Sequence, residues 1–164
     1  MNVLKSRARH ATTAVAAGLL TIAGSQIGAA ASTASTEPTV IELTQTACQF
    51  VEPEGKDHGY TSGRKSDCVA VNDESGAKRL AAVEPLVLKP GKYVFRVTNQ
   101  NVPYELGYYL RAANTLKIPF QPKVSGGGLK AGTTKDYEIE LTAGEYIYSC
   151  PLNPTPDYPI IVRN

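Results

Sequence analysis

The fold is decided by one stretch near the C-terminus, Tyr146-Ile147-Tyr148-Ser149-Cys150-Pro151-Leu152-Asn153-Pro154-Thr155-Pro156-Asp157-Tyr158. The residues up to Cys150 are rich in strand-forming types, which predicts a β-strand. The prolines after Cys150 restrict the backbone and predict a stiff loop. Residues 159–163 are expected to return into the fold as a last strand. The stretch therefore predicts a strand that delivers a single cysteine to a rigid loop.

Two segments further upstream, residues 92–98 and 135–141, alternate between apolar and polar side chains. A period of two marks a half-buried strand. The apolar positions are Tyr93, Phe95 and Val97 in the first segment, and Tyr137, Ile139 and Leu141 in the second. Residues 88–95 and 141–148 also resemble each other as strand-turn-strand units. Two such hairpins facing each other predict a β-sandwich.

The rest of the chain adds one strand and several turns to this prediction. Residues 39–44 are rich in β-formers and predict a first strand. Glycine, proline and short polar residues predict a turn-rich insertion at 52–63 and turns at 73–78 and 126–128. No amphipathic helical pattern extends beyond a turn or two. The sequence therefore predicts an all-β fold.

Residues 1–31 have the layout of an export signal, with a basic start, an apolar run and small residues for cleavage. Cleavage is expected between about residues 28 and 34. Residues 32–37 are interpreted as a flexible lead-in to a domain at 38–164. Glycine and polar residues interrupt the apolar run and basic residues stand on one side only, so we expect no permanent membrane span. The protein is therefore expected to be periplasmic or secreted.

The charge of the chain argues against nucleic acid as a partner. The whole sequence carries a formal net charge of +2, but Lys5, Arg7 and Arg9 belong to the predicted signal. Without them, 14 basic side chains face 15 acidic ones. The exported part therefore lacks the excess of positive charge that nucleic-acid binding requires.

The three cysteines, Cys48, Cys68 and Cys150, all lie in the predicted exported part. In an oxidising compartment we expect two of them to pair. Cys48 with Cys68 is the preferred disulfide, because these residues are 20 positions apart and flank a polar loop that lacks core material. Closing a loop of that size contributes about 3 kcal/mol in the chain-entropy model. Pairing that involves Cys150 stays open, since spacing alone does not determine connectivity.

Two further features are the segment Asn99-Gln100-Asn101-Val102-Pro103 and the strand 144–150 with its downstream loop. Together these two segments resemble the cupredoxins, the small exported β-sandwich proteins that carry blue copper. The resemblance covers most of residues 86–164 and implies an all-β, cupredoxin-like Greek-key β-sandwich. It also implies a histidine just after the first segment, the cysteine, and a second histidine with a methionine in the last loop.

The sequence departs from this ligand pattern at every position except Cys150. Tyr104 stands in the slot after Pro103, and residues 151–158 contain neither histidine nor methionine. Type-1 copper needs two imidazoles and a thiolate, so we expect no cofactor. The phenol of Tyr104 could fill the space of the missing ligand and hydrogen-bond there. As an alternative, copper could bind through Cys150 with atypical ligands, for which His58 and Glu105 are the candidates.

Each of these residues also has a plainer interpretation. Cys150 could equally be a redox thiol or a packed, inert thiol, and His58 a solvated loop residue. No Ser-His-Asp set, paired carboxylates or phosphate-binding glycine motif supports an enzyme. The sequence thus predicts a non-enzymatic binding or accessory module without type-1 copper. Its unknown protein or small-molecule partner would bind at the loop end, meaning the end of the sandwich with Tyr104 and loop 151–158. The alternative is a copper-binding or electron-transfer protein that uses Cys150.

Overall fold

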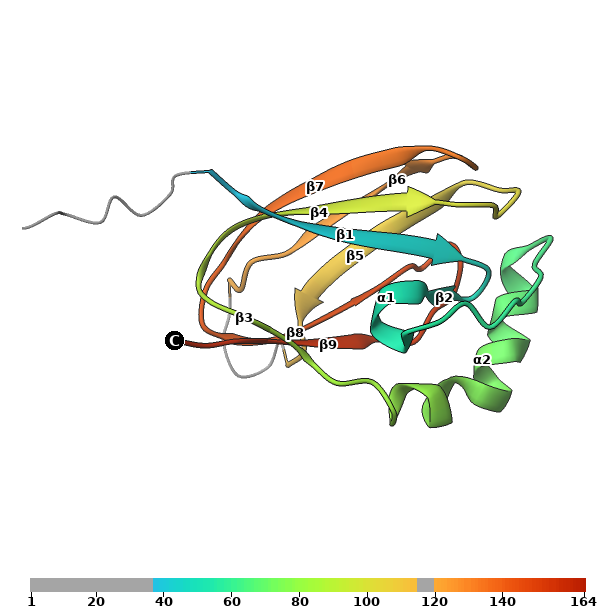
Figure 1. Ribbon diagram of the computed structural model, residues 1–164, viewed down its shortest axis with the longest axis horizontal. Helices are drawn as coiled ribbons and strands as arrows, with labels where there is room; N and C mark the ends of the chain where they lie inside the picture. The colour runs from blue at the N-terminus through green and yellow to red at the C-terminus, as the bar shows by residue number, and fades with distance from the viewer. Residues whose placement is uncertain (1–36, 115–119) are drawn as a thin grey trace, which may run out of the picture. The chain divides into compact units, whose positions relative to one another are not determined.

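The computed structural model describes residues 37–114 and 120–164 (Figure 1). All of them belong to the second of two compact units, Ser35–Asn164. The predicted export signal, residues 1–31, and most of the predicted lead-in lie outside the described residues. Across the two described ranges, no helix has the length and apolar character needed to cross a membrane.

Nine strands form two sheets in the described part of the chain. The first sheet has the order β2 (Gln49–Phe50), β1 (Thr39–Thr46), β4 (Gly91–Asn99), β7 (Thr134–Leu141). The second has the order β3 (Leu86–Leu88), β9 (Tyr158–Val162), β8 (Gly144–Ser149), β5 (Leu106–Ala112), β6 (Val124–Leu129). Two pairs, β1 with β4 and β3 with β9, are parallel, and the others are antiparallel. The two sheets confirm the predicted β-sandwich.

Aromatic rings from both sheets fill the space between them. Phe95 of β4 stacks on Tyr108 of β5 with ring centroids 5.6 Å apart. Phe50 of β2 meets Tyr148 of β8 edge-on at 5.2 Å, and Tyr148 lies 5.3 Å from Tyr158 of β9. Such pairs stabilise a core beyond the area that they bury. Alternation along the strands thus turns these rings inward.

The prediction of two hairpins is wrong. Residues 88–95 run from β3, which pairs with β9, into β4, which pairs with β1 and β7. Residues 141–148 likewise run from β7 in the first sheet to β8 in the second. Both units therefore join the two sheets. The period of two reports which side chains are buried, and this is the same whether a turn stays in one sheet or crosses to the other.

The predicted turn at 73–78 is also wrong, because α2 (Lys65–Leu80) is a helix of 16 residues. Its buried side is made of Cys68, Gly76 and Arg79. That stripe is not apolar, so the helix lacks the hydrophobic period by which helices are found in sequences. A disulfide and polar contacts hold it to the sandwich, together with the partly buried Val71 and Leu80. The predicted insertion at 52–63 begins with a single helical turn, α1 (Val51–Glu54).

The glycines at 126–128 lie inside β6 and form no turn. β5 and β6 approach closely here, since a Cβ atom on Gly107 would stand 2.6 Å from the carbonyl oxygen of Gly126. The register between β5 and β6 shifts between Leu106 and Tyr108. The close approach of the two backbones therefore requires glycine at position 107 of β5, which is a reason unrelated to turn formation.

Candidate functional site

The loop end is assembled from four parts of the chain, of which only the end of β8 and the loop after it are adjacent in sequence. The end of β8 delivers Cys150, and the loop after it delivers Asn153. The connection between β4 and β5 delivers Tyr104, and α2 brings the Cys48–Cys68 disulfide, which the structure confirms. The contacts described below join all four parts.

Asn99 at the end of β4 organises the connection that carries Tyr104. Its side chain is fully buried, and its amide nitrogen donates to the carbonyl oxygens of Val102 and Leu129, both at 3.2 Å. Its side-chain oxygen accepts the backbone N–H of Val102 at 2.9 Å. The amide nitrogen also lies 3.3 Å from the carbonyl oxygen of Tyr104. The first asparagine of the family-like segment thus fixes the turn that places Tyr104.

Cys150 is a free thiol that is 1% exposed. Its sulfur accepts the backbone N–H of Gly107 at 3.4 Å and of Asn153 at 3.2 Å. Its own backbone N–H donates to the hydroxyl of Thr155 at 3.1 Å. Burial raises the pKa of the thiol, and the N–H donors offset this only in part. The thiol is therefore held in place and kept protonated, which does not favour a reactive thiol.

Asn153 connects the loop after β8 to the turn between β1 and β2. Its side-chain oxygen accepts the backbone N–H of Cys48 at 3.0 Å, and its amide nitrogen donates to the carbonyl of Thr46 at 2.9 Å. The same oxygen lies 3.0 Å from the disulfide sulfur of Cys68. With no exposed surface, Asn153 has its polar groups satisfied inside the protein.

Tyr104 contacts both Asn153 and the disulfide through its hydroxyl group. Its hydroxyl lies 2.7 Å from the hydroxyl of Ser62 and donates to the side-chain oxygen of Asn153 at 3.3 Å. It also lies 3.9 Å from the sulfur of Cys68. Burial raises the pKa of the phenol, so it stays neutral at physiological pH. Tyr104, Asn153 and the disulfide thus form one hydrogen-bonded cluster beside Cys150.

The two alternative ligand candidates make their own contacts outside this cluster. Glu105 accepts the backbone N–H of Gly128 at 2.7 Å and so supports β6. His58 lies 2.8 Å from Glu54 and stacks on Tyr60 with ring centroids 5.4 Å apart. Within the two described ranges, no group of three or more His, Cys, Asp or Glu side chains is arranged to hold a metal ion.

The donors beside Cys150 do not fit a type-1 copper ion. Such a centre uses two neutral imidazoles with one thiolate. Here the sulfur accepts two backbone N–H groups, and the cluster beside it presents the carboxamide of Asn153 and the phenol of Tyr104. Donors of this kind do not replace imidazole at a copper–thiolate centre.

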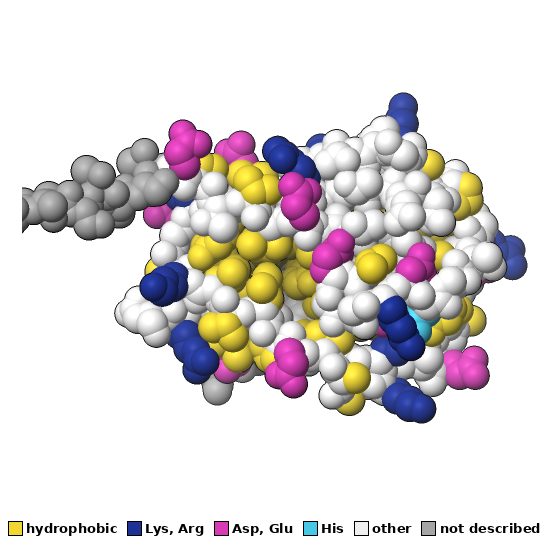
Figure 2. Space-filling view, in the orientation of Figure 1, with side chains coloured by type: hydrophobic (Ala, Val, Ile, Leu, Met, Phe, Trp, Pro, Cys, Tyr) yellow, Lys and Arg dark blue, Asp and Glu magenta, His cyan; other side chains and the backbone are white. Residues whose placement is uncertain are grey.

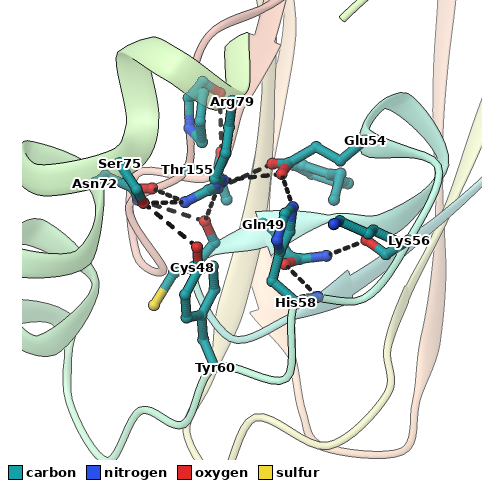
Figure 3. Close-up of polar contacts among 12 residues, drawn as sticks. Cys48, Gln49, Glu54, Lys56, His58, Tyr60, Asn72, Ser75, Arg79 and Thr155 are labelled. Atoms are coloured by element: carbon teal, nitrogen blue, oxygen red, sulfur yellow. Dashed lines mark hydrogen bonds and ion pairs between the residues drawn. The ribbon is translucent and has the colours of Figure 1, made fainter. Parts of the chain in front are cut away.

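A second polar cluster holds α1 and α2 to the sandwich (Figure 3). Arg79 of α2 binds Glu54 of α1 through two hydrogen bonds of 2.8 and 2.9 Å, with side chains that are 7% and 2% exposed. The guanidinium also donates to the carbonyl of Cys48 at 3.1 Å and lies 5.1 Å from the ring centre of Tyr60. Tyr158 donates to Glu54. Burial raises the pKa of Glu54, but the hydrogen bonds from Arg79 and Tyr158 lower it by more. The pKa of Glu54 therefore lies below its ordinary value.

Sequence reasoning missed Asn153 and the Glu54–Arg79 pair, and it included Asn99 only as part of the segment that resembles the cupredoxins. Asn153 is the only carboxamide in residues 151–158, and this was the available signal. The Glu54–Arg79 pair spans 25 positions and joins two different helices, so no local pattern indicates it.

Comparisons with known proteins identify no family for this chain. No protein-family model and no curated protein matches this chain. Matching solved structures include auracyanin A, a blue copper protein from the green thermophilic photosynthetic bacterium Chloroflexus aurantiacus. That match has 12% sequence identity and a TM-score of 0.43, and it covers 77% of this chain and all of auracyanin A.

Proposed function

We propose that this protein is an exported, non-enzymatic binding or accessory module that has no type-1 copper centre. The observation that carries the proposal is the hydrogen bond between Tyr104 and Asn153, beside a Cys150 that is 1% exposed. At this end of the sandwich, polar side chains bind one another where a copper protein would present imidazoles. The Cys48–Cys68 disulfide supports export, because disulfides persist in oxidising compartments.

A surface for a partner lies next to the cluster. Pro151 and Leu152 form one side of a cleft of about 430 Å³, and Tyr109 and Lys123 contribute to the rest of its lining. Leu152 is 41% exposed, and Arg111 lies over the ring of Tyr109 at 4.7 Å. Exposed apolar and aromatic groups with nearby cations are typical of binding surfaces. The prolines of the loop keep this surface preformed.

The copper part of the proposal is tested by adding Cu(II) to the purified protein and to a Cys150→Ser variant. We expect no intense thiolate-to-copper absorption band in either, and no metal above background in protein isolated from its native compartment. A blue protein whose colour depends on Cys150 would refute this part.

The binding part is tested by affinity isolation of partners from the native compartment. A Leu152→Asp variant should lose material that the wild type retains. Val69 on α2 is also 41% exposed and lies outside the cleft, so Val69→Asp is the matched control. Equal recovery by both variants would show that the loop end is not the binding surface.

A second candidate, copper binding or electron transfer through Cys150, is supported by one observation. Two backbone N–H groups, from Gly107 and Asn153, donate to the sulfur, and hydrogen bonds of this kind stabilise a thiolate. His58 or Glu105 would have to move to join Cys150 in such a site. The Cu(II) titration distinguishes the two proposals, because only this one predicts a copper signal that Cys150→Ser removes.

A further inference from the structure

A groove of about 770 Å³ opens between β1 and β3, and its lining includes neither Tyr104 nor any residue of the loop 151–158. Ile41 and Leu43 of β1 line one wall, and Leu86 and Val87 of β3 line the other. Figure 2 shows hydrophobic side chains gathered in a hollow between these strands, with acidic side chains at its margin. Val87 is 51% exposed. The volume lies within the range of about 300–1,000 Å³ that is typical of ligand sites.

The wall formed by β1 is an open strand edge. β2 pairs only with Gln45 and Thr46, and β4 pairs with the opposite side of β1. The backbone N–H of Thr44 points away from β4, since it donates to the carboxylate of Glu52 at 2.7 Å. Backbone groups alternate in direction along a strand, so the N–H and C=O groups of Val40 and Glu42 also point away from β4, as those of Thr44 do. In the described part of the chain, no strand pairs with them.

The opposite wall is an edge as well. β3 pairs with β9 on one side only. The carbonyl of Leu88 accepts the N–H of Arg163 at 2.9 Å, in the direction of β9. The same alternation turns the backbone groups of Val87 toward the groove side. Open edges of this kind are templates for an added strand.

The charge around the groove is acidic. Its lining includes four glutamates, Glu42, Glu52, Glu54 and Glu84, and contains no lysine, arginine or histidine. Glu54 is paired with Arg79 inside the protein, and Glu42 lies 3.6 Å from Arg96 in an exposed contact. Exposed pairs contribute little, so the rim keeps a negative character.

We propose that this groove binds an extended segment of a partner protein, with apolar residues alternating with lysine or arginine. The segment would add a strand to β1 through the free groups of Val40 and Glu42. Its apolar side chains would fill the space beside Leu43 and Val87, and its basic side chains would meet the glutamates of the rim. Strand addition of this kind takes affinity from the backbone and specificity from alternate side chains.

The same charge distribution disfavours a second copy of the chain as the occupant. Antiparallel pairing of two β1 edges would bring the Glu42 side chains of both copies near each other. Like charges facing across a strand pair destabilise it. Charge complementarity therefore selects a basic segment.

The proposal is tested with the full chain and a fluorescent hexapeptide of alternating lysine and valine, by fluorescence anisotropy. A hexapeptide of alternating glutamate and valine is the comparison. We expect the basic peptide to bind at least about tenfold more tightly, with an affinity that falls as salt rises. Equal binding of both peptides, or a Kd weaker than about 1 mM for the basic one, would overturn the proposal.

Two variants separate the strand edge from the charge. Val40→Pro removes one outward N–H without touching the bonds to β4, and should weaken binding about fivefold, as the loss of one hydrogen bond implies. The double variant Glu42→Gln/Glu84→Gln should weaken binding of the basic peptide and reduce its salt dependence. Glu138→Gln/Glu140→Gln on β7 makes the same change of charge outside the groove, and should leave binding unchanged.

Folding of every variant is checked by thermal denaturation, so that the charge variants decide the matter if Val40→Pro does not fold. Binding that survives both groove variants would overturn the proposal. Self-association of the full chain that competes with the peptide would do so as well, because it would make a second copy the occupant.

Discussion

Replacing Arg79 with methionine should destabilise the protein strongly. The guanidinium is 7% exposed, and in the wild type it satisfies the carboxylate of Glu54, which is 2% exposed. Removing one partner of a buried ion pair costs about 3–5 kcal/mol, because the other charge stays buried without compensation. A cavity of about 370 Å³ borders both residues and gives water a route to the carboxylate of Glu54 once its partner is removed. We therefore expect a loss at the lower end, about 3 kcal/mol.

The size of this loss should depend on pH. In the wild type the pKa of Glu54 lies below its ordinary value of 4.5, so the pair contributes stability above that pH and loses it as the pH falls. In Arg79→Met, burial remains while the main donor is gone, so the folded-state pKa of Glu54 should rise above 4.5. Protonation then relieves the buried charge.

The assay is urea denaturation at pH 7 and pH 4 with the disulfide intact, followed by far-ultraviolet circular dichroism. Lys78→Met is the matched control, because Lys78 is exposed on the same helix and should change stability by less than about 0.5 kcal/mol. The deficit of Arg79→Met relative to Lys78→Met should shrink at pH 4. A deficit below about 1 kcal/mol at pH 7, or one of equal size at both pH values, would refute the reasoning.

Three further outcomes are expected. Cys150 should react slowly with iodoacetamide in the native protein and quickly after unfolding, because the thiol is buried and its pKa is raised; rapid native labelling would contradict its placement. Replacing Cys48 and Cys68 together with alanine should lower the free energy of unfolding by about 3 kcal/mol, measured in urea, whereas an unchanged midpoint would contradict the disulfide. Gly107→Ala should cost about 1–3 kcal/mol, because its Cβ would stand 2.6 Å from a carbonyl oxygen of β6. The control Gly63→Ala, with its nearest contact at 3.8 Å, should be close to neutral in the same melting experiment.

Much of the strand content could be predicted from the sequence. The alternation at 92–98 and 135–141 corresponds to β4 (Gly91–Asn99) and β7 (Thr134–Leu141), and residues 39–44 lie in β1. Burial of one face of a strand leaves a period of two in the side chains, so these segments carry a local signal. The Cys48–Cys68 pairing was predictable for a similar reason, since the two residues are close in sequence.

The pairing of strands carried no such signal. Backbone hydrogen bonds are made by groups that every residue shares, so alternation does not distinguish a hairpin from a crossing between sheets. α2 was missed for a different reason, because its buried side holds Cys68, Gly76 and Arg79 in place of an apolar stripe. Its stability comes from the disulfide and from the bond between Arg79 and Glu54, which are tertiary contacts.

The sequence by itself determined the sandwich strands, the departure from the copper ligand pattern and the presence of one cysteine in a proline-rich loop. These depend on the identity of residues at single positions or on short periods. Only the tertiary structure decided that Tyr104, Asn153 and the disulfide meet beside Cys150, and that His58 and Glu105 bind other groups. It also decided that the open edges of β1 and β3 face one groove with an acidic rim. Hydrogen bonds and surfaces of this kind join residues that lie tens of positions apart, and folding alone brings them together.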